Sequence, residues 1–129
     1  MSDPRSAVGD LVELRVPASG AYLAVLRTAA AGLAARLGFT LDGIEDLRIA
    51  VDEACAMLLP LADPGSALDC RFELHIDVLD VRVSVPSSAA ELPGRETFAW
   101  TVLSALAGEV DSTVDDDGRV AIVLRKKRG

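Results

Sequence analysis

The sequence predicts an α/β (α+β) fold, a two-layer sandwich in which helices cover one face of a mixed, mostly antiparallel sheet. Short segments with alternating apolar and polar residues predict half-buried strands, and longer segments with apolar residues three and four positions apart predict helices. These signals follow one another in the order β-α-α-β-β-α-β-β along 129 residues. We expect a single domain over residues 1–129, with a flexible segment at 1–9 and a basic tail at 125–129.

The first strand and the first helix have clear boundaries. Apolar and charged residues alternate from Val12 to Val16, which predicts a half-buried strand that Pro17 ends. Residues 22–37 are rich in alanine and leucine and contain no proline, which predicts a helix. Gly38 follows at a position suited to a helix C-cap.

The second helix is predicted over residues 42–61, with Thr40 or Asp42 as its N-cap and Pro60 near its end. Glu53 lies on a different stripe of this helix from the one that packs, so a second, partly acidic face could line a site. The packing stripe shows the spacing of a helix face that enters a core and consists of Ile44, Leu47, Val51, Ala54, Cys55 and Leu58.

A β-hairpin follows the second helix. Apolar and polar residues alternate strictly from Cys70 to Val78, and the alternation resumes from Val81 to Val85. A tight turn at Leu79-Asp80 is therefore predicted between two strands. His75 falls on the polar face, and we interpret it as an exposed strand residue.

The remaining elements are a third helix and two strands. The helix is predicted from Phe98 to Val110, and the strands over residues 110–114 and 120–124, joined by a turn at Asp117-Gly118. The basic run at residues 125–128 is interpreted as a solvated tail after the last strand.

Composition excludes several classes of function. Thirteen basic and twenty acidic residues give a net charge of −7, which repels phosphate backbones and disfavours nucleic acid as a partner. No segment has the length of an apolar membrane span and no secretion signal is present, so we expect a cytoplasmic protein without membrane contact. Cys55 and Cys70 are expected to be buried free thiols, and with one histidine in the chain no metal site is expected.

The order of elements and the motif IEDLRIAVDEACAMLL resemble the bacterial anti-sigma factors of the RsbW/SpoIIAB type, a serine-protein kinase-like family with the GHKL (Bergerat) ATPase fold. The resemblance covers nearly the whole chain. It implies that Glu53 matches the glutamate that acts as a base in the family, which makes Glu53 the candidate base of this chain. It also implies that Met57 stands where the family has a magnesium-binding asparagine, and that Val85 stands where the family has an aspartate that reads adenine.

These positions make the nucleotide boxes degenerate. A thioether is a poor ligand for magnesium. The segment after Val85, which corresponds to the family's first glycine box, has no paired glycines. The segment at residues 97–99, which corresponds to the second glycine box, has none either. Phosphoryl transfer depends on a held metal and a phosphate cradle. We therefore expect a kinase-deficient protein with no cofactor, although the family implies Mg-ATP. The structural alternative for Glu53 is a partly exposed residue, or one paired with backbone or arginine neighbours.

The resemblance implies an anti-sigma factor that sequesters an alternative RNA polymerase sigma factor and is relieved by an anti-anti-sigma antagonist of the STAS type. The alternative is an active ATP-dependent serine kinase that phosphorylates the antagonist, and a scaffold with no sigma partner stays open. Arg27 matches an arginine that relatives use for partner binding, or its stem could cover apolar surface. A homodimer that shares the first helix is also implied.

Overall fold

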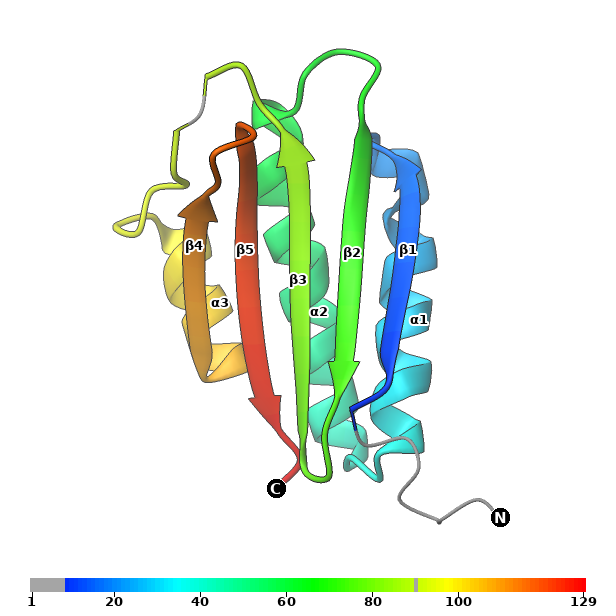
Figure 1. Ribbon diagram of the computed structural model, residues 1–129. Coiled ribbons are helices and arrows are strands. Elements are labelled where there is room, and N and C mark those ends of the chain that lie inside the picture. Colours follow the sequence, from blue (N-terminus) through cyan, green and yellow to red (C-terminus); the bar gives the residue numbers. More distant parts are fainter. Residues whose placement is uncertain (1–8, 90) are drawn as a thin grey trace.

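Five strands form one sheet, and three helices cover one of its faces (Figure 1). The computed structural model describes residues 9–89 and 91–129. No helix within these residues is long and apolar enough to cross a membrane. In chain order the elements are β1 (Leu11–Pro17), α1 (Leu23–Arg36), α2 (Leu41–Leu58), β2 (Ala67–Leu74), β3 (Val78–Pro86), α3 (Phe98–Ala107), β4 (Glu109–Val114) and β5 (Arg119–Lys127), with single 3₁₀ turns at Gly20–Tyr22 and Leu59–Leu61.

The sheet has the strand order β1-β2-β3-β5-β4, and all four pairings are antiparallel. The predicted two-layer class is therefore confirmed, while the described strands contain no parallel pair. The helix pair explains this arrangement. A single helix would return the chain to the start of β1, but two antiparallel helices bring it back to the end of β1, so β2 runs in the opposite direction (Figure 1).

The predicted stripe of α2 forms the centre of the covered side. Leu47, Val51 and Leu58 are fully buried, and Ile44 packs at the margin of the core. The stripe is wider than predicted because Ala50 is also fully buried. Thr40 is the N-cap, since its hydroxyl accepts a hydrogen bond from the Gly43 N–H at 3.1 Å.

The predicted turn at Leu79-Asp80 is wrong. Both residues belong to β3, and the chain reverses between Leu74 and Val78, where the His75 N–H donates to the Val78 carbonyl at 2.9 Å. Alternation of apolar residues continues through the reversal, so the pattern alone does not mark where the ladder of hydrogen bonds ends. His75 consequently lies in the turn, with its side chain 32% exposed.

The third helix ends three residues before the predicted boundary. Gly108 has a φ of +90°, a conformation that favours glycine and terminates α3 after Ala107. Val110 is therefore a residue of β4 alone, where it lies opposite Leu124.

The interpretation of residues 125–128 as a solvated tail is wrong. β5 continues to Lys127, and the Lys126 ammonium donates to the Leu106 carbonyl at 2.7 Å near the end of α3. The Arg128 guanidinium donates to the Leu37 carbonyl at 3.3 Å, after the end of α1. These basic side chains bind helix C-terminal carbonyls, which carry partial negative charge, and thereby tie the last strand to the helical layer. The flexible segment expected at residues 1–9 lies outside the described residues except for Gly9, whose N–H donates to the Leu74 carbonyl.

Both cysteines are free and buried, as predicted. Burial raises the pKa of the Cys55 thiol to about 12, and burial also raises the pKa of the Cys70 thiol. We predict that neither thiol reacts with Ellman's reagent at pH 8 in the native protein and that both react in 6 M guanidinium, because the thiolate is the nucleophile. A cysteine introduced by Thr101→Cys on the exposed side of α3 should react at once and serves as the control. Rapid native labelling of the unmodified chain would contradict the burial of both thiols.

Candidate functional site

Glu53 lies on α2 and is half-buried. No hydrogen bond or ion pair joins its carboxylate to another residue in the described part of the chain. One structural alternative for Glu53 was pairing with an arginine, and no such pair is observed among these residues. The nearby Arg27 pairs with Asp52 instead. Glu53 is a partly exposed carboxylate that remains available for an external group.

Arg27 on α1 pairs with Asp52, the residue before Glu53 on α2, with its Nε atom 3.5 Å from the Asp52 Oδ1 atom. Both side chains are about two-fifths exposed, at 40% and 39%. An exposed pair of this kind contributes at most about 1 kcal/mol. The structure thus places the predicted partner-binding arginine against the residue that precedes the predicted base. Asp52 was missed by the sequence analysis, although the short link at residues 37–40 makes α1 and α2 antiparallel neighbours.

Met57 follows Glu53 by one turn of α2 and packs against the core while remaining partly exposed. At this position a magnesium site would need a hard oxygen ligand. The thioether instead adds apolar contacts, which its flexible chain makes readily. The residue that stands in the expected metal position is therefore a packing residue.

Val85 is fully buried near the end of β3, directly opposite Val120 of β5. Its side chain can neither donate nor accept a hydrogen bond, so it cannot read the amino group of an adenine ring. It fills the core between the sheet and the helices. The position that the resemblance aligns with a base-reading aspartate is part of the apolar interior.

The segment after Val85 is fastened to two other loops. The Pro86 carbonyl accepts from the Asp63 N–H at 2.9 Å, and the N–H and hydroxyl of Ser88 both donate to Asp63 Oδ1, at 2.7 and 2.8 Å. The Ser87 N–H donates to the Gly118 carbonyl at 3.0 Å. A phosphate cradle needs free backbone N–H groups. Those of residues 87 and 88 already have partners within the protein.

The N-terminus of α3 is capped by its own sequence. The Thr97 hydroxyl accepts from the Trp100 N–H at 3.1 Å and donates to the Gly94 carbonyl at 3.0 Å. Arg95 lies over the Trp100 ring, with its guanidinium carbon 5.1 Å from the ring centre, and hydrogen-bonds to Asp111. At the position of the second glycine box, one of the backbone N–H groups of the helix N-terminus, that of Trp100, is thus already hydrogen-bonded within the protein.

Three hollows of about 720, 430 and 360 Å³ occur among the described residues. None of these three is lined by Glu53, Met57 or Val85. The largest lies over charged side chains of β2 to β5, among them Arg71, Glu73 and Arg82. These three hollows thus lie away from the positions that the resemblance assigns to a nucleotide site.

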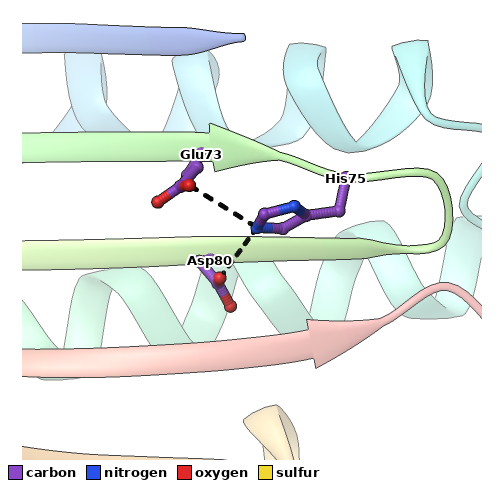
Figure 2. A group of neighbouring side chains, drawn as sticks. All are labelled: Glu73, His75 and Asp80. Atoms are coloured by element: carbon purple, nitrogen blue, oxygen red, sulfur yellow. Dashed lines mark hydrogen bonds and ion pairs between the residues drawn. The ribbon is translucent and has the colours of Figure 1, made fainter. Parts of the chain in front are cut away.

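The sequence analysis also missed a cluster in which Glu73, His75 and Asp80 meet on the uncovered face of the sheet (Figure 2). His75 Nε2 lies 3.0 Å from Asp80 Oδ2 and 3.9 Å from Glu73 Oε1. Glu73 and His75 are two positions apart on the polar side of a predicted strand, which was the available signal. The misplaced turn concealed Asp80, because it put that residue between the strands.

A five-stranded antiparallel sheet covered by three helices is consistent with the GHKL type of two-layer sandwich. No protein-family model matches the chain. The chain is, however, similar to several individual proteins. The chain is 40% identical to "Serine-protein kinase RsbW" of Bacillus subtilis over 78 residues, which cover 58% of this chain and 49% of the relative. It is 38% identical to the protein of the same name from Halalkalibacterium halodurans over 76 residues, with 58% and 47% covered.

A longer match is to "Anti-sigma-F factor RsbW" of Mycobacterium tuberculosis, with 34% identity over 104 residues, 81% of this chain and 62% of the relative. The chain is therefore a relative of the RsbW proteins, and the resemblance to the RsbW/SpoIIAB type is confirmed. The chain spans about half the length of the Bacillus and Halalkalibacterium relatives that it matches.

Proposed function

We propose that this protein is an anti-sigma factor that sequesters an alternative RNA polymerase sigma factor by protein contact and is relieved by a STAS-type anti-anti-sigma antagonist. Two findings support the proposal. The mycobacterial relative is named as an anti-sigma-F factor, and the first helix has an outward face suited to protein contact.

The outward face of α1 carries the proposal. A surface helix of a monomeric domain normally turns charged and polar residues to water. Here the exposed positions of α1 before its last residue are small or apolar and uncharged, and Val25 is 49% exposed. Contiguous exposed apolar surface is typical of protein interfaces. These positions are Ala24, Val25, Thr28, Gly32 and Ala35.

The net charge of the whole chain and the small side chains of α1 suit two kinds of partner. The net charge of −7 would speed encounter with basic regions of a sigma factor more than it would add affinity. Small side chains on α1 let two helices approach closely, and we propose that a homodimer also forms. Arg27 lies toward α2, beside this surface, where its guanidinium can exchange Asp52 for a partner carboxylate.

We further propose that ATP binding is weak or absent. The support is the packing role of Met57, the burial of Val85 and the internal hydrogen bonds of residues 86–88. Release of the sigma factor would then depend on competition by the antagonist, without a nucleotide cycle.

We predict that coexpression with sigma factors encoded nearby yields a stable complex, measured by co-purification and then by calorimetry. Val25→Glu and Arg27→Glu should each weaken it by at least about tenfold, since each puts a carboxylate into the contact. Thr101→Glu on the exposed side of α3 is the matched control and should bind as wild type does. Arg27→Glu also places a carboxylate next to Asp52. Cooperative thermal unfolding of this variant must therefore be shown, so that weaker binding is not caused by misfolding. Failure to bind any sigma factor or antagonist of the source organism would refute the proposal.

A second candidate function is a serine kinase acting on the antagonist. It is favoured by the half-buried carboxylate of Glu53, which has no partner among the residues that the structure describes, and by relatives named serine-protein kinases. In that reaction Glu53 would take the proton of the serine hydroxyl while the γ-phosphoryl group moves from ATP to the serine oxygen and ADP leaves.

Transfer of radiolabel from ATP to a purified antagonist separates the two candidates. The leading proposal predicts no transfer by the wild-type chain. Transfer that is lost in Glu53→Gln and kept in Glu45→Gln, an exposed carboxylate on the same helix, would establish the kinase instead. Equal transfer by all three proteins would mean that Glu53 is not the base.

A further inference from the structure

Glu73, His75 and Asp80 form a cluster on the face of the sheet opposite the helices (Figure 2). Glu73 on β2 and Asp80 on β3 are direct cross-strand partners, and His75 lies in the turn that joins these strands. We propose that this cluster binds a divalent transition metal ion, with Zn²⁺ as the representative ion, through His75 Nε2 and one oxygen each of Glu73 and Asp80. The inference does not depend on the proposed function.

The three ligand atoms lie within 4.8 Å of one another, which is close to the spacing that such an ion requires. In a tetrahedral zinc site, bonds of about 2.0 to 2.2 Å place the ligand atoms roughly 3.3 Å apart. His75 Nε2 lies 3.0 Å from the Asp80 oxygen and 3.9 Å from the Glu73 oxygen, on either side of that value. A small rotation of the Glu73 carboxylate, which is 47% exposed, would complete the site and leave a further position open to water.

The ligand set determines which ions are favoured. One imidazole nitrogen with two carboxylate oxygens suits zinc, copper, nickel or iron, whereas magnesium and calcium prefer oxygen ligands alone. The metal takes the place that a proton occupies on Nε2, so the imidazole binds as a neutral ring with its hydrogen on Nδ1. Any proton displaced from Nε2 passes to solvent.

Arg125 positions one of the proposed ligands. Its Nε and Nη2 atoms donate to the two oxygens of Asp80 at 2.8 and 2.9 Å. These hydrogen bonds orient the Asp80 carboxylate before a metal arrives. Arg125 also brings positive charge and shares Asp80 Oδ2, so the ion must compete with it for that oxygen.

A metal here would link β2, the turn and β3 on the uncovered side of the sheet. The hollow of about 720 Å³ on this face includes Glu73, Asp80 and Arg125 in its lining, so a ligand of the metal has room beside the site. The cluster lies on the opposite face of the sheet from the helices (Figure 2), and Glu53 belongs to one of those helices, α2.

The chain has one histidine, so the imidazole signals of untagged protein report this site alone. We expect titration with ZnCl₂ to saturate at one equivalent by calorimetry and to shift the Nε2 resonance of His75 in nitrogen-15 NMR spectra. His75→Gln and Glu73→Gln should each weaken zinc binding by at least about tenfold. Glu13→Gln, an exposed carboxylate of β1, should bind as wild type does, and MgCl₂ should produce no shift of the Nε2 signal.

Two results would overturn the proposal. One is an Nε2 resonance that does not move while zinc binds, which would assign the binding to other groups. The other is equal zinc affinity of wild type and His75→Gln, which would indicate unspecific binding by surface carboxylates.

Discussion

Burial of one stripe of α2 against the inner face of the sheet determines where every candidate functional residue lies. Leu47, Val51 and Leu58 are fully excluded from water, and each contributes about 1.5 to 3 kcal/mol of burial free energy. Because this stripe is fixed, Glu53 must sit on the flank of the helix, and Asp52 must face Arg27 on α1. The helix pair is therefore a rigid frame for one partly acidic edge and one uncharged outward face.

The two faces of the sheet carry different kinds of side chain. Aliphatic side chains fill the covered side, whereas ion pairs between strands occupy the other. Asp69 of β2 binds both Arg15 of β1 and Arg119 of β5 at 2.7 and 2.8 Å. Asp80 of β3 binds Arg125 of β5. These pairs join neighbouring or next-nearest strands on the face that no helix covers.

Local periodicity explains what could be predicted. The order of elements and the stripe of α2 depend on residues a few positions apart, whereas the interpretation of Met57 and Val85 depends on the resemblance to the family. The turn at residues 75–77, the ties made by Lys126 and the bond between Asp63 and Ser88 depend on register and on contacts between distant segments. Apolar alternation is the same on either side of a turn, and a basic run looks alike in water or against helix carbonyls, so the sequence could not distinguish these outcomes.

We propose that this relative of the RsbW proteins keeps the helix pair and binds ATP weakly or not at all. Thermal unfolding with and without excess Mg-ATP tests this most directly. A ligand at a hundredfold its dissociation constant stabilises a protein by about 2.7 kcal/mol, which would raise the midpoint of a domain of this size by roughly 10 °C. The account predicts no shift at millimolar Mg-ATP. A shift of that size would contradict it, because it would mean that Glu53 and the segments around Val85 still form a nucleotide site.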